Sequence, residues 1–218
     1  MLDFKQLSKT LYSAVLSDSL DGIGLPHQAM RPFIRPLDDT LVLMGRARTG
    51  LFAETYSVRD DENPYEIEIA LIDDLKPGDV AVLACGGPTE RIAPWGELLT
   101  TASLARGAVG CVTDGLVRDL RHIRDLRFPL FHGGIGPLDT RGRARMIERD
   151  RVVECAGVTV RSGDIMFGDI DGLVVVPQER ADEVIAKALH KIKSENHTRD
   201  ELKAGLLLRQ VYEKYGVL

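Results

Sequence analysis

Two adjacent side chains near the middle of the chain, Arg118 and Asp119, place a cation next to a carboxylate just after an apolar segment. The run from Val109 to Val112 predicts a core strand that breaks at the turn signal Asp114-Gly115. A helix is expected to follow, with Arg118 and Asp119 in its first turn. A cation beside an oxygen ligand at such a corner suits a metal-bound anion. The alternative is a helix-terminal acid favoured by the helix dipole, with Arg118 in a surface ion pair.

A second candidate lies upstream, in the segment 95–100 with the sequence WGELLT. It follows a glycine-rich break at residues 86–88 and precedes an apolar helical pattern that begins at Leu98. Gly96 and Glu97 are therefore predicted at a helix start, where free backbone N–H groups bind carboxylates or phosphates. Two helix starts, each with a carboxylate and separated by one strand, predict an anion-plus-metal pocket at strand ends.

The elements that must position these residues are strands in the middle of the chain and helices at both ends. The apolar spacing predicts helices from Leu7 to about Gly22, over 65–75 and, with a break at Gly205, over 178–215. Strand-like segments are 41–52 (interrupted by Gly45 and Gly50), 80–84, 109–112, 152–160 and 173–176. This order predicts one layered α/β domain, with strands packed between helices.

Composition sets the broad class of protein. A chain of 218 residues with 44% hydrophobic and 28% charged residues is typical of a soluble globular domain. The net charge of −5 offers no general attraction for nucleic acid or an anionic membrane. Three cysteines without CxxC spacing are interpreted as buried thiols in a reducing compartment. With no signal-peptide pattern and no apolar run of membrane-spanning length, a cytoplasmic protein is expected.

The segment Gly96-Glu97-Leu98, followed over residues 107–119 by the pattern GxxGxVxDGxxRD, resembles one family closely. That family joins the regulator of ribonuclease activity A with the 4-hydroxy-4-methyl-2-oxoglutarate aldolases. Further matches at 128–131, 163–165 and 169–177 extend the resemblance from the first helix to the last. It implies a single domain over residues 1–218, an α-β-β-α sandwich resembling the phosphohistidine swivelling domain, with a C-terminal helical extension. It also implies homotrimers or homohexamers with active sites between subunits.

The resemblance also implies how substrate is bound. Arg118 would contact the keto oxygen of pyruvate, which becomes the enolate oxygen during the reaction. The backbone amides of Leu98 and Leu99, next to Gly96, would receive the pyruvate carboxylate. Arginine suits its role because it stays charged and offers fixed, planar donors. No lysine lies in these motifs, so a Schiff base is not favoured, and metal-ordered water is the expected base.

For the metal, the resemblance makes Asp119 the direct ligand of a divalent cation and matches Glu97 to an acidic position that holds metal-bound water. A glutamate from the C-terminal helix of a neighbouring subunit also reaches these waters in the family's aldolases, and Glu195 is the best match to it. Carboxylate and water ligands favour Mg²⁺ or Mn²⁺ over zinc. Such an ion acts as a Lewis acid on a chelated carbonyl.

This chain departs from the family pattern at two positions. Glu97 stands where aspartate is expected in the better-known aldolases, and the extra methylene would shift the water network or the metal distance. His132-Gly133 replaces an arginine-glycine pair. His132 is either a substrate contact or proton carrier that titrates near neutral pH, or the cap of a turn. Both departures bear on which substrate is used.

The function that the resemblance implies is that of a class II, metal-dependent pyruvate aldolase. It would cleave a 4-hydroxy-2-oxoacid, such as 4-hydroxy-4-methyl-2-oxoglutarate, to pyruvate through a metal-stabilised enolate, with oxaloacetate decarboxylation as a side reaction. The partners expected are a small oxoacid and further copies of the chain, with no nucleic acid or membrane. The alternative is a non-catalytic regulator that binds a ribonuclease, because a shared fold does not determine function.

Overall fold

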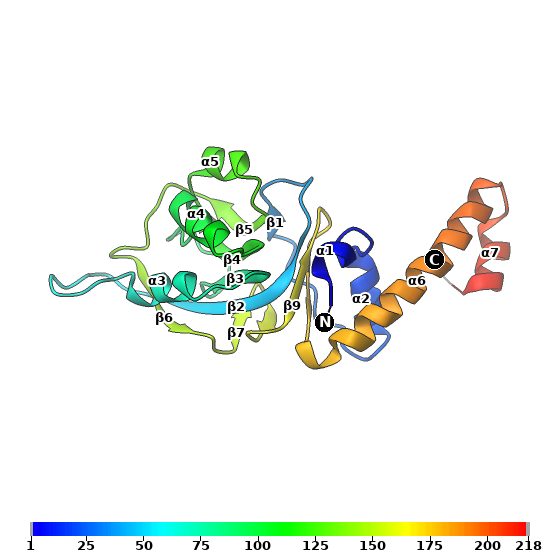
Figure 1. Cartoon of the computed structure of the whole chain (residues 1–218), viewed down its shortest axis with the longest axis horizontal. Helices are drawn as coiled ribbons and strands as arrows, with labels where there is room; N and C mark the ends of the chain where they lie inside the picture. The colour runs from blue at the N-terminus through cyan, green and yellow to red at the C-terminus, as the bar shows by residue number, and fades with distance from the viewer. Residues whose placement is uncertain (1, 217–218) are drawn as a thin grey trace.

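A computed structural model describes residues 2–216, which form a mixed α/β fold around one eight-stranded sheet (Figure 1). Met1, Val217 and Leu218, the ends of the domain expected from the sequence, lie outside the described residues. The sheet order is β1-β5-β4-β3-β2-β9-β10, with β6 also paired to β2. Its strands are β1 (Arg35–Pro36), β2 (Leu43–Glu54), β3 (Asp79–Ala84), β4 (Gly110–Val117), β5 (Leu130–Ile135), β6 (Ala144–Arg149), β9 (Ile165–Gly168) and β10 (Leu173–Val176).

Four neighbouring strands, β2 to β5, run parallel at the centre of the sheet. Every residue of β3 and β4 is buried, because both faces of the sheet are covered at this point. That burial explains why these strands appear in the sequence as continuous apolar runs instead of an alternating pattern. Parallel strands end at the same edge of a sheet, so the segments that follow β3, β4 and β5 meet there.

Strand β2 is long, and one of its edges pairs with two different strands in turn. The sheet bends along this strand. Its first half, from Leu43 to Arg46, pairs with β9, and its second half, from Gly50 to Glu54, pairs with β6. The prediction that this strand is interrupted at Gly45 and Gly50 is wrong, since β2 runs through both residues. A Cβ atom at Gly45 would lie 2.5 Å from the Gly78 carbonyl oxygen, so this glycine permits close packing of the chain.

Helices α3 (Glu66–Asp73), α4 (Glu97–Ala105) and α5 (Leu120–Asp125) cover one face of the sheet (Figure 1). A hairpin of β7 (Val153–Cys155) and β8 (Val158–Val160) packs on the other face through its own apolar cluster. The mixed α/β expectation is confirmed, with a curled sheet and a C-terminal helix. The likeness to the phosphohistidine swivelling domain stays a prediction.

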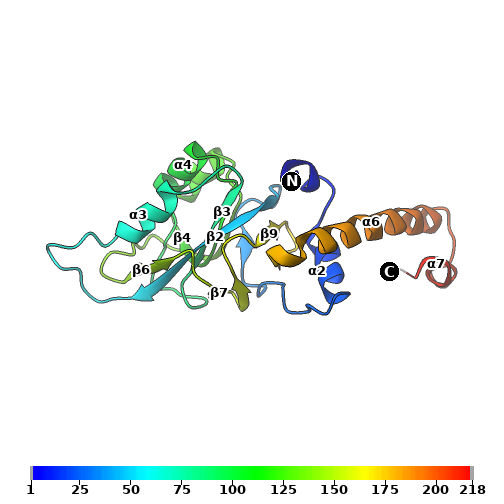
Figure 2. The same ribbon diagram turned by 60° about the horizontal axis from the view of Figure 1, so that its bottom comes forward.

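The two ends of the chain pack together beside β9 and β10. The helices there are α1 (Phe4–Leu7), α2 (Ser13–Asp21) and α6 (Ala181–Lys203), with a short 3-10 turn η1 (Gln178–Arg180) before α6. The later part of α6 extends away from the body and carries α7 (Leu208–Tyr215) at its end (Figures 1 and 2). The break expected at Gly205 is confirmed, because α6 and α7 are separate helices on either side of it.

The single helix expected from Leu7 to about Gly22 is wrong, because the chain opens between α1 and α2. The carboxylate of Asp169, in the turn before β10, accepts hydrogen bonds from the Ser13 amide (2.8 Å) and hydroxyl (2.6 Å). Such contacts satisfy donors that a helix start leaves free. A side chain 156 residues away in the sequence therefore determines where α2 begins.

The turn expected at Asp114-Gly115 is also wrong, since β4 continues through both residues to Val117. Asp114 is completely buried, and its carboxylate accepts hydrogen bonds from the amides of Cys85 (2.6 Å) and Gly87 (2.7 Å). The side chain thus anchors the loop that follows β3 instead of turning its own backbone. Burial raises the pKa of Asp114, and the backbone hydrogen bonds act in the opposite direction.

Replacing Asp114 with alanine is expected to lower the free energy of unfolding by about 2–4 kcal/mol, because two buried amide donors lose a charged acceptor. Asp114→Asn should fall between alanine and wild type, since an amide oxygen replaces only part of the carboxylate. Urea unfolding measures the effect, with the exposed Asp125→Ala as a control expected within about 0.5 kcal/mol of wild type. Equal stability of Asp114→Ala and Asp125→Ala would contradict the anchoring role.

All three cysteines are free thiols, and Cys111 and Cys155 are fully buried, as expected from their apolar surroundings. Burial raises the pKa of both thiols well above the usual value, which keeps them protonated. Across residues 2–216, the longest helices are too short or too polar to span a lipid bilayer.

Candidate active site

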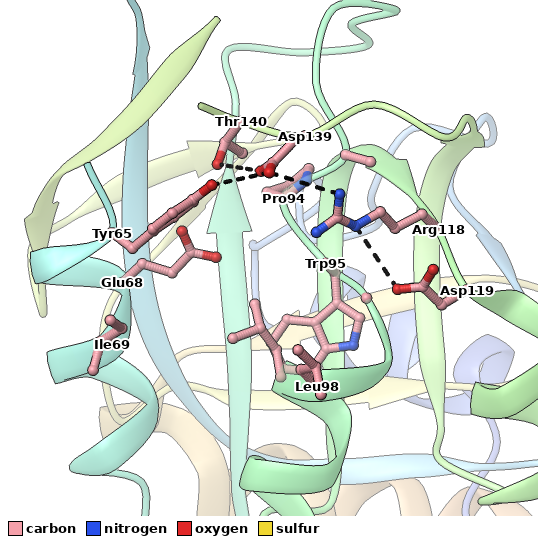
Figure 3. Close-up of a pocket in the computed structure, with 13 residues that line it drawn as sticks. Tyr65, Glu68, Ile69, Pro94, Trp95, Leu98, Arg118, Asp119, Asp139 and Thr140 are labelled. Atoms are coloured by element: carbon pink, nitrogen blue, oxygen red, sulfur yellow. Dashed lines mark hydrogen bonds and ion pairs between the residues drawn. The ribbon is translucent and has the colours of Figure 1, made fainter. Parts of the chain in front are cut away.

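A cavity of about 180 Å³ lies at the carboxyl ends of the parallel strands, between α3, α4 and the segments that follow β4 and β5 (Figure 3). Ligands in open α/β sheets bind at this edge. Sites for drug-sized ligands have volumes of roughly 300–1,000 Å³. This cavity is smaller and suits a small acid. Residues from both predicted motifs line it, namely Gly96, Leu98, Leu99, Arg118 and Asp119.

The end of β4 delivers Arg118 and Asp119 to this cavity. The Arg118 amide donates to the Trp95 carbonyl (3.0 Å), which extends the pairing of β4 along the segment before α4. Asp119 is the N-cap of α5, so the pair precedes that helix and does not form its first turn as expected. Asp119 has a left-handed backbone (φ 61°), which aspartate tolerates better than most residues.

The start of α4 lies against the Arg118-Asp119 pair. The Glu97 amide donates to Asp119 Oδ2 at 3.2 Å, and Arg118 Nε lies 3.7 Å from the same oxygen. A Cβ atom on Gly96 would lie 2.6 Å from Asp119 Oδ2 and 3.2 Å from Arg118 Cγ. Position 96 is therefore a glycine because the carboxylate occupies the space that a side chain would need.

The α4 N-terminus presents free donors to the cavity. Its N-cap is Gly96, which has no side chain to cap the helix, and the Asp119 carboxylate accepts only from the first amide, that of Glu97, among the described residues. The amides of Leu98 and Leu99 belong to the first turn, where an α-helix has no internal acceptors, and both residues line the cavity. Free amides at the positive end of a helix dipole form a site for a carboxylate or phosphate.

Two residues that the sequence did not single out position Arg118. Asp139, in the segment after β5, lies 3.9 Å from Arg118 Nη1 and accepts a hydrogen bond from the Tyr65 hydroxyl (2.9 Å) (Figure 3). Burial acts to raise the pKa of Asp139. The hydrogen bonds from Tyr65 and the backbone, together with Arg118, outweigh it and hold the pKa below its usual value. Asp139 thus stays ionised and holds the guanidinium at the cavity wall.

A third residue that the sequence did not single out is Glu68, on α3. Only 6% of its surface is exposed, and it lines the cavity with Tyr65 and Asp139. Its Oε2 atom is buried and has no hydrogen-bond partner among the described residues. Burial, and to a smaller extent Asp139, raises the pKa of Glu68 to about 7, while Arg118 acts to lower it. A carboxyl group that changes charge near neutral pH therefore faces the cavity.

Replacing Glu68 with glutamine is expected to stabilise the folded protein at pH 8 by up to about 3 kcal/mol, because the buried charge is removed. The pKa of Glu68 is higher in the folded than in the unfolded state, so wild type recovers this free energy as the pH falls from about 7 towards 4.5. Thermal unfolding of both proteins at pH 8 and pH 5 measures the difference. Wild type equal to the variant at both values would contradict a buried, titrating Glu68.

Two predicted residues take other positions. The Glu97 carboxylate accepts from the Thr101 hydroxyl (2.8 Å) on its own helix, so Glu97 offers this site its amide more directly than its carboxylate. His132 lies within β5 between Thr113 and Arg35, is 9% exposed and is not among the residues that line the cavity. Burial lowers its pKa. It therefore lies within a strand and is not brought to the cavity that Arg118 lines.

Glu195 lies on α6, the helix that extends away from the body that contains α4 (Figures 1 and 2). Its carboxylate contacts the Tyr12 hydroxyl and lies within 4.0 Å of Lys191 and Arg199. Burial and the contact with Glu195 raise the pKa of Tyr12 to about 12. One chain does not bring Glu195 to the cavity, so a role there would need a second copy.

The donors available for a metal are few and are all oxygens. No three His, Cys, Asp or Glu side chains within residues 2–216 form a group that could hold a metal ion. Asp119 is the carboxylate of the two predicted motifs that lines the cavity. Its side chain is 44% exposed, and within residues 2–216 its carboxylate accepts a single hydrogen bond, from the Glu97 amide. One carboxylate with water in the remaining positions fits Mg²⁺, which retains several waters when it binds protein.

The family model described as RraA-like, Aldolase/RraA, matches residues 13–175. A protein of Halalkalibacterium halodurans named "Putative 4-hydroxy-4-methyl-2-oxoglutarate aldolase" is 30% identical over 191 residues, 87% of this chain and 84% of that protein. Protein DlpA of Legionella pneumophila is 29% identical over 93% of this chain, which spans only 32% of that protein's length.

Among solved structures, Streptomyces coelicolor RraAS2 has a TM-score of 0.79 and 26% identity, covering 91% of this chain and 98% of that chain. It is described as an unusual member of the RNase ES inhibitor RraA protein family. The similarity therefore includes proteins named for an aldolase activity and proteins named for inhibition of a ribonuclease.

Proposed function

Because this chain belongs to the Aldolase/RraA family, we propose that it is a divalent-metal-dependent lyase that cleaves a 4-hydroxy-2-oxoacid to pyruvate. Decarboxylation of oxaloacetate would be a side reaction, because it passes through the same pyruvate enolate. One observation carries the proposal. Arg118, Asp119 and the free amides of Leu98 and Leu99 line a single small cavity.

Each part of a 2-oxoacid has a complementary group in this cavity. The carboxylate fits the amides of Leu98 and Leu99, where the α4 dipole favours a negative charge. Arg118 is then positioned to donate to the keto oxygen, on which negative charge develops as the C3–C4 bond breaks. Asp139 holds the guanidinium in place, so the donor needs little reorganisation during the reaction.

The residues present fit a divalent cation at Asp119, whose carboxylate faces the cavity with free lone pairs. The ion would be Mg²⁺ or Mn²⁺, with water and the substrate completing its ligands. When bound, such a cation supplies Lewis-acid polarisation of the keto group. Glu97, and Glu195 from a second copy in a trimer or hexamer, are proposed to hold the waters.

The test is pyruvate release by the purified chain from oxaloacetate and a series of branched 4-hydroxy-2-oxoacids. Turnover is expected with Mg²⁺ or Mn²⁺, is expected to stop with a chelator and to return when the metal is restored. Each rate is compared with the rate of the free metal ion at the same concentration. No turnover of any oxoacid with either metal would reject the lyase assignment.

A second candidate function, regulation of a ribonuclease, is supported by the similarity to RraAS2 over 98% of that chain. It is distinguished by inhibition of a purified ribonuclease of the RNase ES type. Inhibition without oxoacid turnover would favour the regulator. Turnover that Asp119→Ala abolishes would favour the lyase.

A further inference from the structure

Glu68 is a buried carboxyl group that the assignments above leave unused. It lies on the same face of α3 as Leu71 and Ile72, one helical turn before them, and that face is buried. Figure 3 shows its carboxyl group turned into the cavity, between Tyr65 and Arg118. An ionisable group at such a position is costly unless it is paired, because burial removes its hydration.

The neighbours that would normally satisfy Glu68 are bound elsewhere. The Tyr65 hydroxyl donates to Asp139, and Arg118 lies near Asp139 and Asp119. Oε2 of Glu68 consequently remains without a partner among the described residues. A buried polar atom left in this state beside a cavity has its potential partner in the cavity itself, where substrate binds.

We propose that Glu68 is the acid–base catalyst of the lyase reaction, an assignment that rests on the function proposed above. As a carboxylate, it takes the proton of the substrate's 4-hydroxyl group. The O–H electron pair then forms the new carbonyl bond, and the C3–C4 pair becomes the enolate double bond of pyruvate. As a carboxylic acid, Glu68 returns the proton to C3, so the substrate gives pyruvate and a second carbonyl compound with no other reactant.

The charges around Glu68 support proton exchange at neutral pH. Burial favours its neutral form, Asp139 adds to this effect and Arg118 opposes it, which together give a pKa of about 7. Tyr65 and Asp119 also face the cavity. A pKa near the working pH is the optimum for a group that must both accept and donate a proton.

The other protein groups nearby are poorer candidates for this role. Burial and the bond to Asp139 raise the pKa of Tyr65, so its phenol stays protonated, and its hydroxyl already donates to Asp139. His132 does not line the cavity. Glu68 therefore offers a protein group for the proton transfer that the sequence alone assigned to metal-ordered water.

The test compares wild type with Glu68→Gln, which keeps size and removes the titrating group, and with Glu68→Asp. The matched control is Glu66→Gln, an exposed carboxylate on the same helix. Glu68→Gln is expected to lower kcat by about 10²-fold with little change in KM. Glu68→Asp should regain part of the rate, and Glu66→Gln should equal wild type.

Two further readouts test acid–base catalysis: the pH profile separates it from a structural role, and infrared spectra identify the titrating group. The kcat/KM of wild type should fall below pH 7 on a limb that Glu68→Gln lacks. Infrared difference spectra of the protein without substrate should show one carboxyl group titrating near pH 7 in wild type and in Glu66→Gln, but not in Glu68→Gln. The acid limb would be the same in wild type and Glu68→Gln if Glu68 only maintained the shape of the cavity, whereas the infrared band assigns the titrating group to Glu68.

The outcomes distinguish this assignment from the proposed function. If wild type releases pyruvate and Glu68→Gln retains its rate and pH profile, the assignment of Glu68 is wrong and the lyase stands. If wild type turns over no oxoacid with Mg²⁺ or Mn²⁺, both fall together. A rate loss in Glu68→Gln with an unchanged acid limb would also overturn the assignment.

Discussion

Replacing Asp119 with asparagine is expected to lower kcat/KM for pyruvate release by about 10³-fold or more. The expectation follows from the loss of the proposed metal ligand at the cavity. Lewis-acid stabilisation contributes several kcal/mol, and about 1.4 kcal/mol corresponds to a tenfold change in rate. Asparagine is the informative substitution, because it tolerates the left-handed backbone of Asp119 (φ 61°) and removes only the charge.

The same variant should lose binding of Mn²⁺ in the absence of substrate, measured by calorimetry or electron paramagnetic resonance. The control is Asp125→Ala, an exposed carboxylate at the other end of α5, which should bind Mn²⁺ and release pyruvate as wild type does. Retention of Mn²⁺ affinity and activity in Asp119→Asn would exclude Asp119 as the ligand. Loss of activity with full Mn²⁺ binding would show that the metal binds at another site.

Replacing Arg118 with alanine is expected to reduce kcat by about 10²–10³-fold, the usual effect of removing one donor that stabilises a developing oxyanion. Arg118→Lys should recover only part of this loss. A lysine ammonium keeps the charge but lacks the planar arrangement of donors that lies between Asp119 and Asp139. Steady-state kinetics with the preferred oxoacid measure both variants.

Arg121→Ala is the matched control for Arg118, because it removes an exposed arginine from α5 next to the site and should leave kcat unchanged. An Arg118→Ala variant with raised KM and wild-type kcat would assign the guanidinium to substrate binding alone. An Arg118→Lys variant as active as wild type would show that charge, without a specific geometry, is sufficient.

The local elements of the site were predictable because their patterns depend on near neighbours. The apolar runs of β3 and β4 and the start of α4 at Gly96-Glu97 were expected and are present. The continuation of β4 through Asp114-Gly115 was not expected. The turn signal of that dipeptide is local, whereas the carboxylate of Asp114 is committed to amides 27 and 29 residues earlier in the chain.

Glu68 and Asp139 show two kinds of missed signal. Glu68 lies three and four residues before Leu71 and Ile72, so the helical period places it on the buried face of α3. A glutamate at a position that the helical period places on a buried face could have identified Glu68 as an unusual carboxylate. Asp139 lies in an irregular segment after β5 and acquires its role from Tyr65 and Arg118, which are distant in the sequence. No local pattern reports such a contact.

The contact between Gly96 and Asp119 restricts how related sequences can change. Any residue larger than glycine at position 96 would place a carbon atom 2.6 Å from Asp119 Oδ2, so the carboxylate would have to shift to accommodate it. A homologue that has lost the need for this carboxylate is released from the restriction and can accept alanine or serine there. The glycine thus keeps open the space in which the proposed metal ligand lies.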